Sequence, residues 1–233
     1  MHETIYTIPL TESLEQESEC PFCYLENKLE EEQVKYALGP AMMEPDHREK
    51  SNLLGYCRRH TKKMNESKLA LPLALVMDTR MDEVLRQLKS AREGMQTRNR
   101  FLKKKNETEK ALSVVTELTA TCLVCDKIRH TMSKFLYTFW YLYKKEPDFK
   151  SRVLKSRGFC LPHFKELLSA TEHAGSRKDQ FVCELLDLEI QNLARNKQDV
   201  TGFINQFDYR HNKDDETVVK NAHQICGGKL SKF

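Results

Sequence analysis

The sequence predicts an all-α protein built from two related helical repeats. The chain has 233 residues with only eight Gly and seven Pro, a composition that disfavours a turn-rich all-β fold. Apolar residues recur at helical spacing, and one set of Cys and His motifs occurs twice, 102 or 103 residues apart. We expect two pseudo-symmetric helical repeats, each tied by a Cys3His metal site, that form one joint domain with a C-terminal tail.

The duplication is visible in three short motifs. In each repeat a CxxC motif is followed by a CxxH motif, after 33 residues in the first copy and 34 in the second. An EPD tripeptide recurs at the same offset of 102 residues, at 44–46 and 146–148. The eight Cys and His residues of the motifs are Cys20, Cys23, Cys57, His60, Cys122, Cys125, Cys160 and His163.

These residue types at this spacing indicate metal binding. Two residues three positions apart share one face of a helix, so each motif can offer two ligands from a single turn. One CxxC and one CxxH together supply three thiolates and one imidazole, a closed tetrahedral shell that suits Zn²⁺. We therefore expect two zinc ions per chain. Closure of each site within its own repeat is the simpler arrangement, although exchange of ligands between repeats is also open.

Three alternatives compete with zinc. The same thiolates can hold an iron–sulfur cluster, since spacing alone does not decide between the two metals. A thioredoxin-like redox pair is a further choice, but it expects a βαβ setting that the sequence lacks. The cysteines can also be buried free thiols, and this is the fate we expect for Cys183.

The first repeat, 1–106, begins with a segment at 4–8 that resembles a short strand. A helix follows the first CxxC and ends before Gly39 and Pro40. After the CxxH, apolar residues between Leu73 and Leu88 outline a long helix to about residue 92, and a further helix within 93–120 connects the repeats.

The second repeat, 107–198, carries the strongest helical pattern. Apolar and aromatic residues from Met132 to Tyr143 fall on one wide face, which predicts a core helix directly behind the second CxxC. A counterpart of the long helix runs from about 181 to 193. In the docking tail, 199–233, Asp199 is a predicted N-cap, and a short final helix closes at Gly227 and Gly228.

Charge and hydropathy restrict the class of partner. Residues 1–33 carry nine Glu and one Lys, a net charge of −8 in a chain whose total is +4. Five cations gather in one segment and make nucleic acid an alternative partner to another protein. They are Arg98, Arg100, Lys103, Lys104 and Lys105. Asp208 and Arg210 are candidates to face a ligand. No apolar run reaches the roughly 20 residues of a membrane span, and no secretory signal is visible, so we expect a cytoplasmic protein.

The duplicated CxxC…GxCxxH plan, the GFCLPHF segment at 158–164 and the FDYR tail at 207–210 together resemble a known family. It is a family of bacterial proteins, found widely in clostridia and related Firmicutes, that is known only as a domain of unknown function. The resemblance covers nearly the whole chain and implies a bacterial cytosolic protein without implying an activity.

We predict no catalytic residue, because no phosphate-binding Gly loop, Ser-His-Asp set or HExxH motif is present. A catalytic zinc keeps one position open, whereas four protein ligands are available here for each site. The sequence therefore favours a protein that binds another protein and is stabilised by metal, and it leans against an enzyme.

Overall fold

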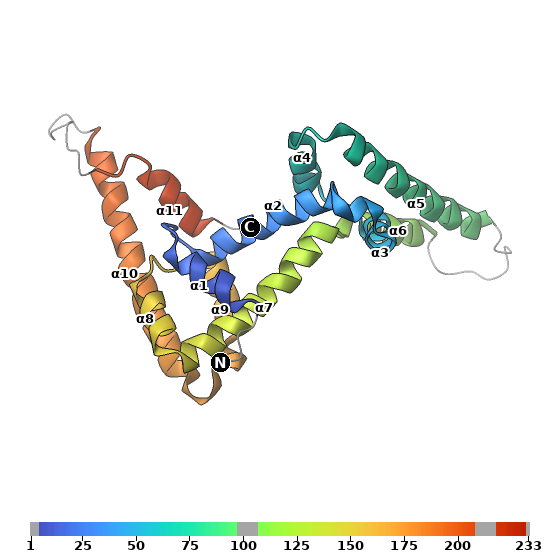
Figure 1. The fold of residues 1–233 in the computed structure, drawn as a ribbon. Helices are drawn as coiled ribbons and strands as arrows, with labels where there is room; N and C mark the ends of the chain where they lie inside the picture. Colours follow the sequence, from blue (N-terminus) through green and yellow to red (C-terminus); the bar gives the residue numbers. More distant parts are fainter. Residues whose placement is uncertain (1–4, 97–106, 208–217, 232–233) are drawn as a thin grey trace. The chain divides into compact units, whose positions relative to one another are not determined.

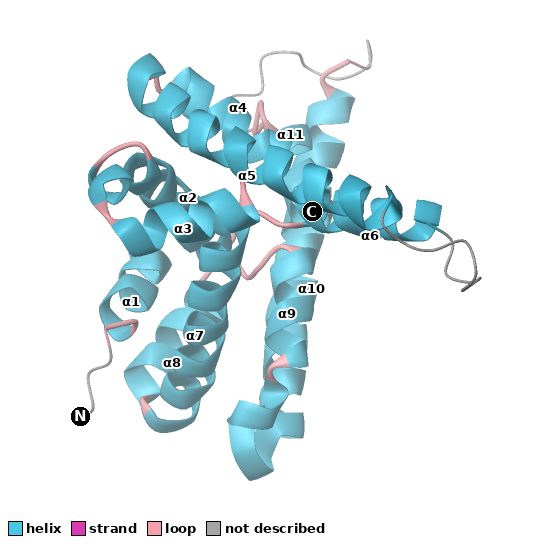
Figure 2. Cartoon of the chain, turned by 90° about the vertical axis from the view of Figure 1, so that its right-hand side faces the viewer, coloured by secondary structure: helices cyan, strands magenta, loops and turns pink. Residues whose placement is uncertain are grey.

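All regular secondary structure is helical in the part of the chain that the computed structural model describes, residues 5–96, 107–207 and 218–231. Eleven α-helices and two 3-10 helices lie in these ranges, and no strand is found there (Figures 1 and 2). The all-α prediction is confirmed. The strand suggested at 4–8 is wrong, because helix α1 (Thr7–Glu15) already begins within it. None of the described helices is both long enough and apolar enough to cross a membrane.

The chain forms two compact units that do not coincide with the two sequence repeats. The first unit comprises residues 1–27 and 131–233, and the second comprises residues 28–130. Two long helices connect them: α2 (Pro21–Ala37) begins in the first unit, and α7 (Leu123–Lys145) begins in the second. Each unit therefore contains the CxxC of one repeat and the CxxH of the other. The repeat boundaries at 106 and 198 stay a prediction.

The second unit is a set of helices around a small aliphatic core. Helix α3 packs against α5, and α5 packs against α6, which lies beside it in Figure 2. The elements are η1 (Pro40–Met43), α3 (Pro45–Leu54), α4 (Arg58–Glu66), α5 (Ala70–Gln96) and α6 (Glu107–Ala120). The core consists of Val34, Ala37, Leu38 and Met64, with Tyr56, Leu73 and Met77 packed against it.

The first unit has a larger, aromatic core. Its remaining elements are α8 (Pro147–Lys155), α9 (Leu161–Ser169), η2 (Thr171–Arg177), α10 (Lys178–Asn205) and α11 (Ala222–Leu230). Phe139 of α7 packs against both Phe22 and Phe159, with ring centroids 5.9 Å and 5.8 Å away. Since Phe22 lies inside the CPFC motif and Phe159 precedes Cys160, this core anchors the backbone that carries the cysteines.

The C-terminal region differs from its prediction in two places. Asp199 lies inside α10 instead of capping a new helix, because the helix that starts at Lys178 continues unbroken to Asn205. Gly227 and Gly228 lie inside α11 instead of closing it, and the backbone N–H of Ser231 still donates to the Gly227 carbonyl, 2.8 Å away. The final helix therefore extends past both glycines.

Candidate metal centres

Four helix N-termini carry the eight Cys and His residues of the motifs. Cys57 and Cys160 are the N-cap residues of α4 and α9, and each is followed three positions later by the His of its CxxH motif. Cys20 and Cys122 directly precede α2 and α7, and the second cysteine of each CxxC lies in the first helical turn. Free N–H groups and the positive end of a helix dipole favour negative charge at these positions, so they suit thiolates.

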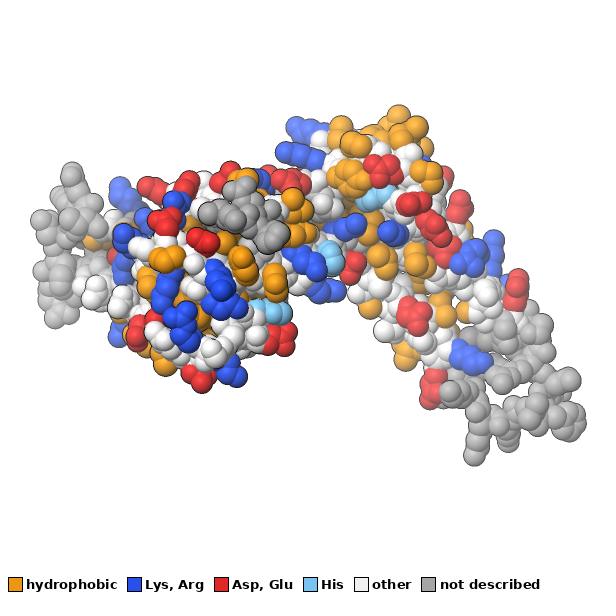
Figure 3. All heavy atoms as spheres, turned by 60° about the horizontal axis from the view of Figure 1, so that its bottom comes forward, with side chains coloured by type: hydrophobic (Ala, Val, Ile, Leu, Met, Phe, Trp, Pro, Cys, Tyr) orange, Lys and Arg blue, Asp and Glu red, His pale blue; other side chains and the backbone are white. Residues whose placement is uncertain are grey.

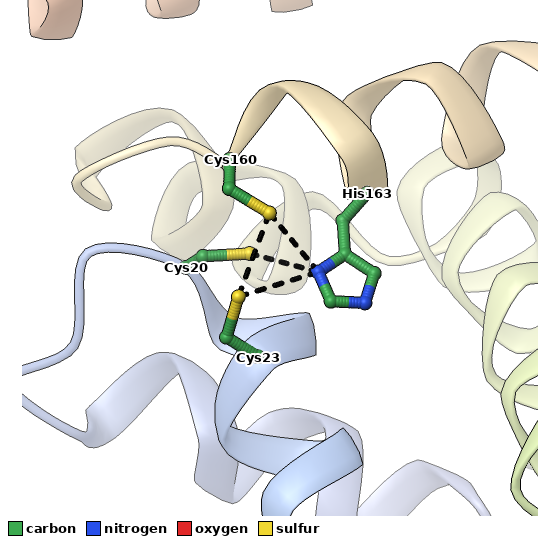
Figure 4. Close-up of side chains that lie close together, drawn as sticks. All are labelled: Cys20, Cys23, Cys160 and His163. Atoms are coloured by element: carbon green, nitrogen blue, oxygen red, sulfur yellow. Dashed lines mark hydrogen bonds between the residues drawn. The ribbon is translucent and has the colours of Figure 1, made fainter. Parts of the chain in front are cut away.

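The first centre joins Cys20, Cys23, Cys160 and His163 within the first unit (Figure 4). The three sulfur atoms lie 3.6, 3.4 and 3.1 Å from His163 Nδ1, in that order, and the Sγ atoms of Cys23 and Cys160 are 3.5 Å apart. Cys20, Cys160 and His163 are buried, and Cys23 is half-buried. All four side chains point toward one common position.

The second centre joins Cys57, His60, Cys122 and Cys125 within the second unit. The sulfur atoms of Cys57, Cys122 and Cys125 lie 3.2, 3.3 and 3.4 Å from His60 Nδ1. The Sγ atoms of Cys57 and Cys125 are 3.9 Å apart. The geometry of the first centre is thus repeated with a second, independent set of four residues.

Both sets of distances fit one tetrahedral ion per centre. With metal–sulfur bonds of about 2.3 Å and a metal–nitrogen bond of about 2.0 Å, tetrahedral ligands lie about 3.8 Å apart for two sulfurs and about 3.5 Å apart for sulfur and nitrogen. The distances in both centres match these values to within a few tenths of an ångström. The residues present can therefore hold a metal ion in each unit.

Closure within each repeat, the simpler arrangement on sequence grounds, is wrong. Each CxxC motif meets the CxxH motif of the other repeat. Helix length explains the exchange: α2 has 17 residues and α7 has 23, about 25 Å and about 35 Å of rigid chain. Such a helix carries the chain away from its own CxxC before the CxxH of the same repeat begins.

A carboxylate stands behind each histidine. Glu30 of α2 is fully buried, and its Oε1 lies 2.9 Å from His60 Nε2. In the first unit Glu26 Oε2 lies 3.6 Å from His163 Nε2, and Glu26 is 21% exposed. Such partners orient a ligand histidine and raise its basicity. The sequence did not single them out, because both lie in the acidic stretch ENKLEEE, where one Glu looks like the next.

Two cations, Arg59 and Lys63, pair with the carboxylate of Glu30. Arg59 Nε lies 2.9 Å from Oε1, and Lys63 also pairs with the carboxylate. Burial alone would raise the pKa of Glu30, but the hydrogen bonds from Lys63 and Arg59 outweigh it and hold the pKa below its ordinary value. Glu30 is therefore ionised and lies beside Nε2 of His60, whose Nδ1 faces the three sulfur atoms.

The pKa values of Cys160 and Cys57, one cysteine in each centre, are lowered, as expected for cysteines that share a site with other ligands. Hydrogen bonds from Cys20 and Cys23 hold the pKa of Cys160 far below its ordinary value. Burial raises the pKa of Cys57, but hydrogen bonds from the backbone N–H of His60 and from Cys122 outweigh it, so its pKa also falls. In each centre the pKa of the cysteine at a helix N-cap is thus lowered.

A glycine with positive φ precedes each CxxH by two residues. Gly55 has φ +61° and Gly158 has φ +72°, a region that side-chain-bearing residues adopt only with strain. A Cβ on Gly55 would lie 2.7 Å from Arg80 Nε, and one on Gly158 would lie 2.7 Å from Glu189 Oε1. The glycine of each GxC segment therefore allows a tight turn that packs against a charged side chain.

Other predicted residues are not brought into a site. The five cations from Arg98 to Lys105, together with Asp208 and Arg210, lie outside the described residues. On the face drawn in Figure 3, basic and acidic side chains are interspersed among the described residues. Cys183, expected in the core, is exposed on α10, so that expectation is wrong. Its neighbours Phe181 and Leu185 are buried, and Cys183 lies between them on another face.

Fold and site together define an all-α protein with two Cys3His groups that could hold metal ions. The chain belongs to a family of unknown function, DUF6062, whose model matches residues 1–232. The resemblance seen in the motifs is thereby confirmed, while bacterial origin stays a prediction. Neither a curated protein nor a solved structure matches the chain.

Proposed function

We propose that the chain binds two zinc ions as structural centres and that its role is to bind another protein. The observation that carries the zinc assignment is the convergence of two sets of three thiolates and one imidazole, with all ligand atoms of each set within 4.8 Å of one another. A shell closed by four protein ligands is typical of structural zinc, whereas catalytic zinc retains a water position. Reduced thiols of this kind fit the cytoplasm.

The distances favour a single ion over a polynuclear iron–sulfur cluster. In such a cluster the cysteines bind different irons, so their sulfur atoms must surround a larger cage. Sulfur atoms 3.5 Å and 3.9 Å apart leave room for one ion. The carboxylates behind His60 and His163 support the same assignment, because ligand histidines usually donate their second N–H to such a partner.

Elemental analysis of protein purified without oxygen tests the zinc assignment. We expect two zinc ions per chain, no visible absorbance, and an X-ray absorption spectrum with three sulfur neighbours and one nitrogen neighbour for each ion. Iron with sulfide and a brown colour would instead place the protein in the redox class. Protein without metal in either preparation would contradict the proposal.

The binding role is supported by apolar side chains on the second unit. Leu71 and Met81 of α5 and Leu112 of α6 are 70%, 59% and 63% exposed. Contiguous exposed apolar patches mark protein interaction sites, and we assign these three side chains to one such surface. A variant with Lys at these three positions should keep both zinc ions yet lose the partner that wild-type protein crosslinks in its host cell. Retention of the same crosslinked partner would contradict this surface as the binding site.

A further inference from the structure

A cavity of about 330 Å³ lies against the sulfur atoms of the first centre. One wall carries Cys20, Cys23 and Cys160. The other wall comes from α11, through residues that include Ile225 and Lys229. The last helix therefore lines the cavity opposite these three cysteines.

Lys229 connects α11 by hydrogen bonds to the two ligand loops, which are the backbone segments directly before Cys20 and Cys160. Its side chain is 1% exposed, and Nζ donates to the backbone carbonyls of Glu19 and Arg157, each 2.5 Å away, and of Phe159, 3.2 Å away. Glu19 directly precedes Cys20, and Phe159 directly precedes Cys160. One buried ammonium thus connects α11 to the two backbone segments that lead into the CxxC and CxxH motifs of the first centre.

Helix α11 has little helical stability of its own. The helix has nine residues, shorter than the roughly 12–15 residues at which isolated helices become marginally stable in water. It also contains two glycines, each of which weakens a helix interior. Helix α11 therefore stays folded through its docking, and Lys229 provides its most buried polar contacts.

We propose that α11 is a removable cover over the first centre, latched by Lys229, and that metal ions and thiol reagents reach Cys20, Cys23 and Cys160 when this helix undocks. The proposal rests on the proposed metal site, and it makes exchange at the first centre depend on a helix that contributes no ligand. Exchange at the second centre does not depend on α11.

Residue-resolved alkylation of the zinc-loaded full chain tests the cover. The probe is iodoacetamide, and mass spectrometry follows each cysteine separately. We expect Lys229→Met to accelerate alkylation of Cys20, Cys23 and Cys160 at least about tenfold, the loss expected for a latch of several hydrogen bonds to a charged group. Cysteines of the second centre should keep their wild-type rates. The matched control is Lys220→Met, at an exposed lysine just before α11, which should change neither set.

A second variant moves the rate in the opposite direction. Gly227→Ala favours the helical state of α11, and the added Cβ meets no atom within 4 Å. Alkylation at the first centre should slow about threefold, with the second centre unchanged. A merely damaged fold cannot produce slower alkylation, so this variant remains informative if Lys229→Met loosens the whole chain.

Unchanged first-centre rates in both variants would overturn the cover. Acceleration of all six ligand cysteines together in Lys229→Met, with no slowing in Gly227→Ala, would overturn it as well. Failure of the underlying zinc assignment looks different, because wild-type protein would then hold no zinc before any variant is compared.

Discussion

The two units enclose the same four-ligand set in different surroundings. In the first unit, Phe22, Phe139 and Phe159 pack directly behind the ligand loops. At the matching motif positions the second unit has Val124 and Tyr56, and its core is small and aliphatic. The same set of four ligands can thus rest on a large hydrophobic core in one unit and substitute for much of such a core in the other.

The charged residues that bind the backbone next to the two centres also differ. In the second unit, Arg80 donates to the carbonyls of Asn52, Leu53 and Leu118, which precede the two ligand pairs. In the first unit Lys229 plays this part from another helix, while Glu189 occupies the place over the glycine that Arg80 fills in the second. In both units a cation ties the two ligand loops together, but Arg80 and Lys229 do not occupy equivalent positions in the repeat.

Loss of a ligand gives the largest expected effect and the clearest contrast between the units. Cys122→Ala and Cys160→Ala should each lose one of two zinc ions. Because metal binding energy is folding energy at such sites, the second unit should unfold in Cys122→Ala, whereas the aromatic core should keep most of the first unit folded in Cys160→Ala. Hydrogen exchange measured for each unit checks this. Equal unfolding of both units in both variants would break the comparison.

The carboxylates behind the histidines provide a second contrast. Glu30→Gln should weaken zinc binding at the second centre about 10–100-fold, since a buried, ionised partner 2.9 Å from His60 is lost. Glu26→Gln should have a smaller effect, because Glu26 lies 3.6 Å from His163 and is partly exposed. Competition with a chromogenic chelator measures both affinities. A larger loss in Glu26→Gln would reverse the ranking.

Replacement of either positive-φ glycine by alanine should lower the unfolding free energy by a similar amount. Gly55→Ala and Gly158→Ala each place a Cβ in a left-handed conformation and against a charged side chain. Each should cost about 1–2 kcal/mol of unfolding free energy from the backbone alone. Chemical denaturation measures the loss, and Gly202→Ala, in the helical interior of α10, serves as the control. A neutral result at either glycine would contradict the shared turn geometry.

The smallest expected effect is a pH dependence of the unfolding free energy that arises from Glu189 and is confined to the first unit. Burial raises its pKa from 4.5 to about 7, against the hydrogen bond from the Phe159 N–H and the charge of Lys229. The folded chain therefore binds a proton that the unfolded chain has lost, and the resulting stability disappears as pH rises through 7. Relative to wild type, Glu189→Gln should gain about 1 kcal/mol between pH 6 and pH 8.

Denaturation at a series of pH values checks this gain. Arg80→Gln is the control from the second unit, since an arginine does not titrate in this range. A flat difference between Glu189→Gln and wild type across this range would contradict the raised pKa.

Much of the fold and all eight candidate ligands could be predicted from local pattern. Helical spacing from Met132 to Tyr143 and the motif spacing both act within one or two turns, where sequence is informative. The pairing of motifs could not be predicted, because the two CxxC pairs are chemically equivalent and only the length of α2 and α7 decides which CxxH each meets. Glu30 and Lys229 were missed for the same reason, since their partners are distant in sequence.

We infer that each CxxC pairs with the CxxH of the other repeat. Alkylation of zinc-loaded Cys20→Ser tests this pairing, because loss of one ligand exposes the remaining thiolates of the same centre. Cys23 and Cys160 should become reactive, while Cys57 stays protected with Cys122 and Cys125. Reactive Cys57 beside a protected Cys160 would contradict the claim and return each ligand set to its own repeat.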